Sequence, residues 1–328
     1  MYSSLIIGAG MIAGGYDDLN SSFALTHAHG YINSEFFNLL GFYDIDYNMA
    51  LEKANKWKVQ ALKEIVKADV YSICTPDNTH LSMLKEVLKF NPKLVFLEKP
   101  VGVTLEENNE IIELSKRTPV VINYSRRFLH EFQDLSKRIN SGEFGDFYKG
   151  YCSYGKGFLH NGSHLRDLIE LLVGCIVKIE YLDGFIDYRN EDPSYSCFLY
   201  VNSNIQSRDL STSQIGINKI DVSKIDIKED KKIFVQAMNS NLYQTSEIDL
   251  YFTSGRIRII NGGSTIEIYK VEENKVYPGY FNLVLKESFP VNQNKAIACA
   301  MENIANYLNN KEPILSTPYI DSALKYIK

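Results

Sequence analysis

Short apolar runs alternate with amphipathic stretches through the first hundred residues. The runs lie at residues 5–7, 36–44, 69–74 and 93–97, where they are typical of buried strands in a parallel sheet. The stretches between them have helical spacing at residues 27–33, 49–57, 61–67 and 81–90. This alternation predicts an α/β fold whose N-terminal part is a Rossmann-type, doubly wound parallel sheet.

The second half of the chain changes to segments in which apolar and polar residues alternate. Ile257 and Ile259 are separated by a polar neighbour, as are Ile266 and Ile268, which is typical of strands with one covered face. Strands are expected at residues 146–154, 176–188, 194–201, 231–237, 247–252, 256–260 and 265–271, and helices at 163–172, 294–308 and 318–327. The pattern predicts a C-terminal α+β domain with a large open, mostly antiparallel sheet.

A glycine motif follows the first apolar run. Gly8, Gly10 and Ala13 fit G-x-G-x-x-A, in which the glycines allow a tight turn and let a pyrophosphate approach the backbone. The N–H groups at the following helix start, including those of Met11 and Ile12, would hold the phosphates together with the helix dipole. A plain turn is the structural alternative, but the position after an apolar strand favours a dinucleotide site.

An acidic residue ends the second apolar run. Asp44 can bind the adenosine ribose hydroxyls and would repel a 2′-phosphate, which favours NAD over NADP. Asp46 is the second candidate for this role, and a solvated strand-end aspartate is the structural alternative. The spacing from the glycines is lengthened by a polar insertion at residues 16–25. The sequence leaves open whether that insertion is a surface loop or a flap close to the cofactor.

Composition narrows the class of protein. The 328 residues suggest two domains, and the formal net charge of −5 gives no indication of nucleic acid or an anionic membrane as partner. The sequence shows no signal-peptide pattern and no apolar run long enough for a membrane helix. Its five cysteines are scattered and form no C-x-x-C pair, which indicates reduced thiols in a cytoplasmic protein.

Several motifs together resemble the Gfo/Idh/MocA oxidoreductase family. They are Gly8-Ala-Gly10, Asp44, Thr75-Pro76 with His80, Glu98-Lys-Pro100, residues 123–128 and residues 161–167. They follow the family's order along essentially the whole chain. The resemblance implies an NAD(P)-binding Rossmann domain at residues 1–123 and a substrate-binding and oligomerisation domain at 124–328. It further implies cofactor contacts by Thr75, Pro76, His80 and Glu98, a sugar-like substrate, and a homodimer or homotetramer formed through the C-terminal sheet.

Lys99 is the first catalytic candidate. An alcohol dehydrogenase must remove the hydroxyl proton as hydride leaves the carbon, and the base needs a pKa near neutrality. Burial lowers the pKa of a lysine, because the charged form loses solvation. The resemblance implies that this lysine lies at the substrate, whereas an ion pair with Glu98 is the structural alternative.

His164 is the second candidate, as an acid/base or as a binder of a substrate hydroxyl. A histidine at a helix start is more often structural, but the resemblance implies a role in the site. The sequence departs from the family here, because many members have Asp where this chain has His160. Either His160 binds the substrate, or proton transfer rests on Lys99 and His164 alone. No metal is expected at this histidine pair, because the HExxH glutamate is absent.

For other polar residues the sequence indicates a role in substrate binding less specifically. Either Arg127 or its neighbour Arg126 could hold a substrate phosphate, and an ordinary salt bridge is equally compatible with the sequence. Tyr154 and Lys156 could line the sugar pocket. The pair formed by residues 27 and 29, both histidines, stays ambiguous.

The leading functional hypothesis is an NAD-dependent dehydrogenase acting on a secondary hydroxyl of a sugar or sugar derivative, with sugar phosphates and nucleotide sugars among the candidates. The second hypothesis is a glycosidase or epimerase-like enzyme in which held NAD oxidises the sugar transiently. The third is a non-catalytic sensor on the same fold, against which the presence of Lys99 and His164 argues. The sequence identifies neither the sugar nor the carbon that is oxidised.

Overall fold

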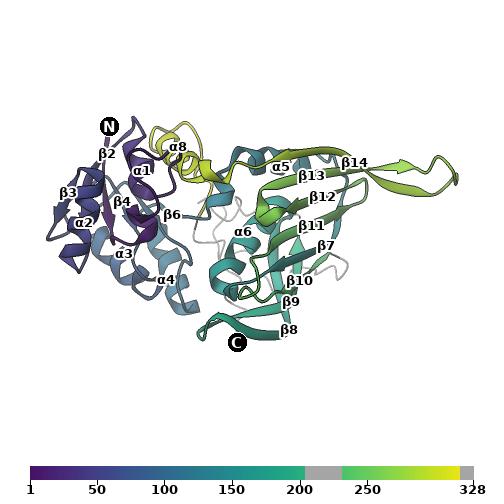
Figure 1. Ribbon diagram of the computed structural model, residues 1–328, viewed down its shortest axis with the longest axis horizontal. Helices are drawn as coiled ribbons and strands as arrows, with labels where there is room; N and C mark the ends of the chain where they lie inside the picture. The colour runs from purple at the N-terminus through teal and green to yellow at the C-terminus, as the bar shows by residue number, and fades with distance from the viewer. Residues whose placement is uncertain (204–230, 318–328) are drawn as a thin grey trace. The chain divides into compact units, whose positions relative to one another are not determined.

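The computed structural model of the protein describes residues 1–203 and 231–317 (Figure 1). The chain divides into two compact units. The first holds residues 1–129 and the stretch that begins at Gln293, and the second holds His130–Asn292. The division lies near the expected one at residue 123, but the helix expected at 294–308 belongs to the first unit instead of the second. The helix expected at residues 318–327 lies outside the described residues.

The first unit is built on six parallel strands in the order β3-β2-β1-β4-β5-β6. Their bounds are β1 Tyr2–Ile7, β2 Phe37–Tyr43, β3 Gln60–Leu62, β4 Val70–Ile73, β5 Leu94–Leu97 and β6 Val120–Ile122. This order confirms the predicted Rossmann sheet. Strands β2 and β3 are added on one side of β1, and β4, β5 and β6 on its other side, so the strand order reverses between β1 and β4. A ligand is therefore expected beyond the carboxyl ends of these two strands.

Helices cover both faces of this sheet. Their bounds are α1 His27–Ile32, α2 Tyr47–Trp57, α3 His80–Leu88, α4 Leu105–Ser115 and α8 Ala296–Leu308, with short helical turns η1 Met11–Gly15, η2 Asp77–Thr79, η3 Ser125–Phe128 and η8 Gln293–Lys295. Ile6 and Phe96 pack in one apolar cluster with side chains of α1, α2 and α8. Leu5 and Val95 pack in a second cluster with α3 and α4. Each such fully buried side chain stabilises the fold by about 1.5–3 kcal/mol.

Two local predictions in the first unit have different outcomes. The helix predicted at residues 61–67 is wrong, because the chain forms the edge strand β3 and then continues without regular structure. Gln60 pairs with Gly41 of β2, so backbone bonding to the sheet outweighs weak helical spacing. The interruption of the first helix is confirmed, since η1 ends at Gly15 and α1 begins at His27. Thr26 caps α1 by accepting the His29 N–H.

The second unit is built on eight strands in the order β14-β13-β12-β11-β7-β10-β9-β8. Their bounds are β7 Phe147–Tyr154, β8 Cys175–Arg189, β9 Asp192–Asn202, β10 Lys232–Ala237, β11 Ser246–Phe252, β12 Gly255–Ile260, β13 Thr265–Glu273 and β14 Phe281–Pro290. All neighbouring pairs are antiparallel except β7 with β10. This arrangement confirms the predicted open, mostly antiparallel sheet. Strand β14 was not predicted.

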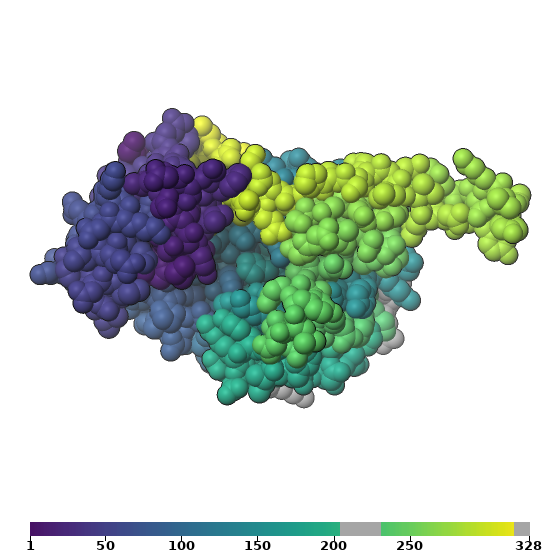
Figure 2. Space-filling view, in the orientation of Figure 1, coloured from purple at the N-terminus to yellow at the C-terminus, as the bar shows by residue number. Residues whose placement is uncertain are grey.

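Two helices accompany the second sheet, α5 His130–Asn140 and α6 Gly162–Val173, with short helical turns η4 Gly157–Asn161 and η7 Asn261–Gly263. Helix α6 is buried along almost its whole length and contacts β7, β8 and β9. Ser136 of α5 donates a hydrogen bond of 2.8 Å to the Leu171 carbonyl, which joins the two helices. The hairpin of β13 and β14 projects away from the other strands of its sheet (Figures 1 and 2).

Candidate functional site

The glycine turn lies at the carboxyl end of β1. Gly8 has a φ of +93°, and a Cβ there would lie 2.7 Å from the Cys74 carbonyl oxygen. Only glycine fits this conformation and this space. A Cβ on Gly10 would meet no atom within 4 Å, so this glycine faces open space. A tight turn at Gly8, followed by a glycine that borders open space at Gly10, is the arrangement that the predicted pyrophosphate site requires.

The helix after the turn is shorter than the motif suggests. η1 is a single turn, and Gly14 leaves helical geometry with a φ of −169°. A macrodipole needs aligned peptides over several turns, so its contribution here is small. The capacity to bind phosphate oxygens therefore lies in the N–H groups at the start of η1, where Met11 and Ile12 stand. These N–H groups have no partner within a helix, because they belong to its first turn.

Asp44 lies against the glycine turn, as the sequence predicts. One carboxylate oxygen accepts the Ala9 N–H at 2.7 Å, and the other accepts the Asp46 N–H at 2.9 Å. The carboxylate is thereby oriented at the end of β2, directly beside the turn. Asp46, the second candidate, instead caps α2 by accepting the Asn48 N–H at 2.9 Å. The structure therefore places Asp44 at the glycine turn and Asp46 at the start of α2.

The loop after β4 contains the predicted Thr75 and Pro76, and the predicted His80 begins α3. His80 is almost fully buried, and its ring nitrogens lie 2.9 Å from the Pro100 carbonyl oxygen and 3.1 Å from that of Thr75. The ring therefore links the loops that follow β4 and β5. Its side chain holds these loops in place instead of facing solvent, while Thr75 is only partly buried.

Glu98 follows β5 and is 8% exposed. Its Oε1 lies 2.8 Å from His27 Nε2 and 2.6 Å from Asn123 Nδ2. Burial raises the Glu98 pKa, but the hydrogen bonds from His27 and Asn123 and the nearby positive charge of Lys99 act more strongly in the other direction. The pKa of Glu98 therefore lies below its ordinary value. Lys99 is partly buried at the same strand end.

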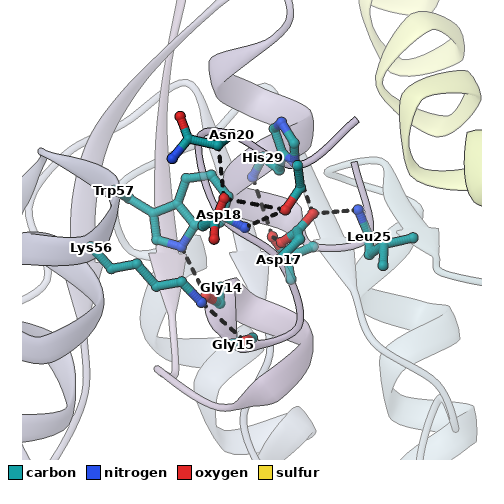
Figure 3. A network of polar contacts seen from close by, with 11 residues as sticks. Gly14, Gly15, Asp17, Asp18, Asn20, Leu25, His29, Lys56 and Trp57 are labelled. Carbon is teal, nitrogen blue, oxygen red and sulfur yellow. Dashed lines mark hydrogen bonds and ion pairs between the residues drawn. The ribbon is translucent and has the colours of Figure 1, made fainter. Parts of the chain in front are cut away.

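The insertion at residues 16–25 is anchored beside the glycine turn (Figure 3). The buried Asp17 carboxylate accepts hydrogen bonds from the Leu25 N–H, at 2.5 Å, and from Thr26 Oγ1, at 2.5 Å, and lies 2.8 Å from His29 Nδ1. On the other side of the turn, Trp57 Nε1 donates to the Gly14 carbonyl at 2.8 Å. Asp17 thus ties the start of the insertion to α1, while Gly14, in η1 just before the insertion, is bonded to α2.

The predicted substrate-binding residues outside the strand ends lie in different surroundings. Arg127 is in η3 of the first unit and is 3% exposed, so its side chain is packed inside that unit. Tyr154 is 1% exposed, and its hydroxyl donates to the Tyr195 carbonyl at 3.0 Å and accepts the Tyr195 N–H at 2.8 Å. Burial raises the Tyr154 pKa. These contacts give Tyr154 a structural role that joins β7 to β9.

His160 and His164 both lie in the second unit, and both are partly buried. His160 belongs to η4, and its ring centroid lies 5.1 Å from that of Tyr188. His164 stands in the first turn of α6. The short turn η4 therefore carries one predicted histidine and leads directly into the helix that carries the other.

Two aspartates that the sequence did not single out hold the segment 156–160. Asp192 accepts the N–H groups of Leu159, at 2.7 Å, and His160, at 2.9 Å. Asp187 accepts the Lys156 N–H at 2.8 Å. Burial raises the Asp192 pKa above its ordinary value, although these backbone bonds act in the opposite direction. No sequence motif includes either aspartate. Their role is seen only in the structure, where both lie near the turn between β8 and β9.

The described residues contain neither a group placed to hold a metal ion nor a helix that could span a membrane. Within residues 1–203 and 231–317, no group of three His, Cys, Asp or Glu side chains is placed to hold a metal ion. Among the same residues, no helix has the length and apolar character to cross a membrane.

A parallel sheet of this order, with a glycine turn and a strand-end carboxylate bonded to it, defines a dinucleotide-binding protein. Residues 3–125 match the model of the GFO_IDH_MocA oxidoreductase family, described as having an NAD-binding Rossmann fold. This match confirms, over residues 3–125, the resemblance seen in the motifs.

Curated relatives match parts of the chain. The scyllo-inositol 2-dehydrogenase (NAD(+)) of Bacillus subtilis (strain 168) is 37% identical over 87 residues, which is 25% of this chain and 25% of that protein. The D-glucoside 3-dehydrogenase of Escherichia coli (strain K12) is 27% identical over 152 residues, or 44% of this chain and 40% of that protein. The chain thus spans less than half the length of these relatives.

The fold itself is similar over nearly the whole chain to a solved structure. The UDP-N-acetylglucosamine 3-dehydrogenase GnnA from Acidithiobacillus ferrooxidans has a TM-score of 0.69 and 15% identity, covering 99% of this chain and 96% of that chain. At this identity the likeness concerns the fold, which includes both the Rossmann sheet and the open sheet.

Proposed function

We propose that this protein is an NAD-dependent dehydrogenase that oxidises a secondary hydroxyl of a sugar or sugar derivative. The observation that carries the proposal is the arrangement of strand ends in the first unit. An open glycine turn, the Asp44 carboxylate bonded to that turn, and the pair Glu98-Lys99 all follow strands of one parallel sheet. The family and the dehydrogenase names of its relatives support the class of reaction.

The residues of the first unit fit the cofactor. Gly8, Gly10 and the N–H groups of Met11 and Ile12 would hold its pyrophosphate, because they offer donors beside open space. Asp44 would hold the adenosine ribose hydroxyls, and its charge favours NAD over NADP. Thr75, Pro76 and Glu98 would line the nicotinamide end, with His80 holding their loops in place. Bound NAD supplies the acceptor for the hydride that leaves the substrate carbon.

Lys99 would take the proton of the substrate hydroxyl on its Nζ. A general base must lie within hydrogen-bond reach of the proton that it takes. Lys99 is partly buried at the end of β5, on the side of the sheet where the nicotinamide is expected. His164 would bind or protonate the substrate from the first turn of α6, and His160 would contact it from η4. The bonds from Asp192 and Asp187 to the loop backbone would keep His160 in one conformation.

The finer substrate class and the assembly are also part of the proposal. Inositols, glucosides, sugar phosphates and nucleotide sugars are the candidate substrates. The assembly would be a homodimer or homotetramer in the cytoplasm, formed through the second sheet. Its edge hairpin carries exposed apolar side chains, of which Val276, Tyr277, Tyr280 and Phe281 are each more than 60% exposed, at 73%, 64%, 70% and 67%.

A substrate screen with NAD+ tests the proposal. Purified protein is incubated with NAD+ and single inositols, glucosides, sugar phosphates or UDP-sugars, and NADH absorbance is followed. Net accumulation of NADH with one group of these compounds is the expected result. Product formation without net NADH would indicate transient oxidation, as in an epimerase-like enzyme. NAD binding with no conversion of any compound would indicate a sensor and would overturn the proposal.

A further inference from the structure

A buried chain of polar groups runs beneath the carboxyl end of β5. Tyr31 Oη lies 2.7 Å from Ser72 Oγ, which lies 2.8 Å from His27 Nδ1. His27 Nε2 then lies 2.8 Å from Glu98 Oε1, and Asn123 Nδ2 lies 2.6 Å from the same oxygen. His27 and Ser72 are fully buried. The chain joins α1, β4, β5 and the segment after β6 at the strand ends of the first unit.

When the His27 ring is neutral, the chemistry of these groups fixes the direction of every hydrogen bond. An ionised carboxylate can only accept, so His27 must donate through Nε2–H. A neutral imidazole has one N–H, so its Nδ1 accepts from the Ser72 hydroxyl. Ser72 in turn accepts from the Tyr31 hydroxyl. All donors thus point toward Glu98 Oε1, and hydrogen bonds aligned in this way strengthen one another.

The chain also fixes the orientation of Glu98. Its Oε1 accepts from two buried donors on separate elements, so the carboxylate cannot rotate without leaving a buried donor unsatisfied. The side chain keeps 11% of its surface exposed, so it is not sealed into the core. Lys99 is the next residue along the backbone. The Lys99 charge acts on the Glu98 carboxyl group, so a carboxylate held in one orientation keeps a fixed negative charge in the surroundings of the Lys99 ammonium group.

We propose that His27 is a positioning residue for the strand-end pair Glu98-Lys99. By donating Nε2–H to Glu98 Oε1, it holds a negative charge at a fixed place beside the lysine. The proposal rests on the proposed function, because it concerns the lysine that would accept the substrate proton. His27 lies 71 residues from Glu98 in the sequence, and the first helix brings them together.

The first test measures the tautomer of His27 and needs no substrate. Protein labelled with ¹⁵N in its six histidines is compared with a His27→Gln variant, which assigns the His27 ring signals by their loss. The proposal expects the Nε2–H tautomer at neutral pH, with and without NAD+. An Nδ1–H tautomer would overturn the direction of the chain and with it the positioning role.

The second test compares three variants by kcat, KM and NAD+ affinity with the substrate found in the screen. His27→Leu removes the donor and should lower kcat about 10- to 100-fold, because misplaced catalytic groups lose rate on that scale. His27→Gln offers an amide N–H of similar reach and should recover part of that loss. His29→Leu, which removes the neighbouring buried histidine of the same helix, is the matched control and should leave kcat within about twofold.

The outcomes separate this inference from the proposed function. An unchanged kcat in His27→Leu, or equal losses in the Leu and Gln variants, would overturn the positioning role while leaving the dehydrogenase intact. Absence of turnover by the unaltered protein would overturn the proposed function and leave the tautomer measurement standing. If His27→Leu does not fold, the Gln variant against the His29→Leu control decides the question.

Discussion

Two buried carboxylates, one in each unit, are held in opposite ways. Glu98 accepts from side chains, since His27 and Asn123 both donate to its Oε1. Asp192 accepts from the backbone, since the N–H groups of Leu159 and His160 bind its two oxygens. A carboxylate bonded by side chains is oriented by residues that can be replaced singly. A carboxylate bonded to backbone groups determines the path of the chain around it.

This difference shows what holds each of the two predicted sets of functional residues in place. At the Glu98 end, the sheet fixes the backbone and the polar side chains fix the charge. At the Asp192 end, the backbone between β7 and α6 has no sheet to follow, so the aspartates supply its partners. We therefore expect substitutions near Glu98 to change the rate of the reaction, and substitutions of Asp192 to change loop conformation and substrate affinity.

The largest expected effect comes from Lys99→Met. Losing a general base lowers kcat by about 10²- to 10⁴-fold, while the affinity for NAD+ should change little because the glycine turn is untouched. NADH formation and a fluorescence titration with NADH measure the two quantities. The control is Lys89→Met, since Lys89 is exposed at the end of α3 and pairs with Glu86 of that helix. A Lys99→Met variant with full turnover would refute the assignment of the base.

Asp192→Ala should have the next largest effect. It leaves the Leu159 and His160 N–H groups without their acceptor, which costs about 1–3 kcal/mol of stability for each buried group that finds no replacement. The KM for the sugar should rise about tenfold, because His160 is no longer held in place. NAD+ affinity should not change. The matched control is Glu191→Ala, and an equal effect of the two substitutions on KM would argue against the loop-holding role.

Asp44→Asn tests the other end of the first unit. Removing the charge weakens the bond to the Ala9 N–H and the bonds expected to the ribose, so NAD+ affinity should fall about tenfold. Discrimination against NADP should fall as well, because the repulsion of a 2′-phosphate is lost. Dissociation constants for both cofactors measure this. Asp46→Asn should affect the α2 cap alone, so an equal loss there would point to Asp46 as the ribose ligand.

The smallest expected effects are on the pH dependence of stability, and they have opposite signs at the two carboxylates. The Glu98 pKa is lowered by folding, so its contribution is present above the unfolded value near 4.3 and is lost as pH falls. The Asp192 pKa is raised by folding, so its contribution is present below the unfolded value near 3.9 and is lost as pH rises through the folded value.

Urea unfolding between pH 3 and 7, compared with Glu98→Gln and Asp192→Asn, checks these signs. Each slope is bounded by about 1.4 kcal/mol per pH unit for one proton. Glu98→Gln should flatten the loss of stability at acid pH, and Asp192→Asn should remove a slope in the other direction. Slopes of the same sign at both sites would contradict the electrostatic difference described here.

Much of the first unit could be predicted from the sequence, because its signals are local. Gly8, Asp44 and Glu98 each stand directly after an apolar strand, and parallel topology brings strand ends to one edge of the sheet. The pairing of His27 with Glu98 could not be predicted, since no spacing rule links residues that far apart. Of the two histidines whose roles the sequence leaves open, His27 is bonded to Glu98 and His29 to Asp17.

The second unit was harder to predict for two physical reasons. Strand β14 has almost no buried side chains, so it shows no apolar alternation and depends on backbone bonding to β13. Asp187 and Asp192 accept hydrogen bonds from backbone N–H groups, and no residue type in the sequence indicates such a contact. Tyr154 was expected to line the sugar pocket, but it is the last residue of β7 and its side chain is buried. Its hydroxyl meets Tyr195 instead.

The central claim is that NAD lies along the glycine turn with its reactive ring beside Lys99. A crystal structure of the protein with NAD+ tests this most directly. We predict pyrophosphate oxygens on the N–H groups after Gly10, ribose hydroxyls on Asp44, and nicotinamide C4 within a few ångströms of the Lys99 side chain. A cofactor bound elsewhere, or a Lys99 side chain turned away from the nicotinamide ring, would contradict the account.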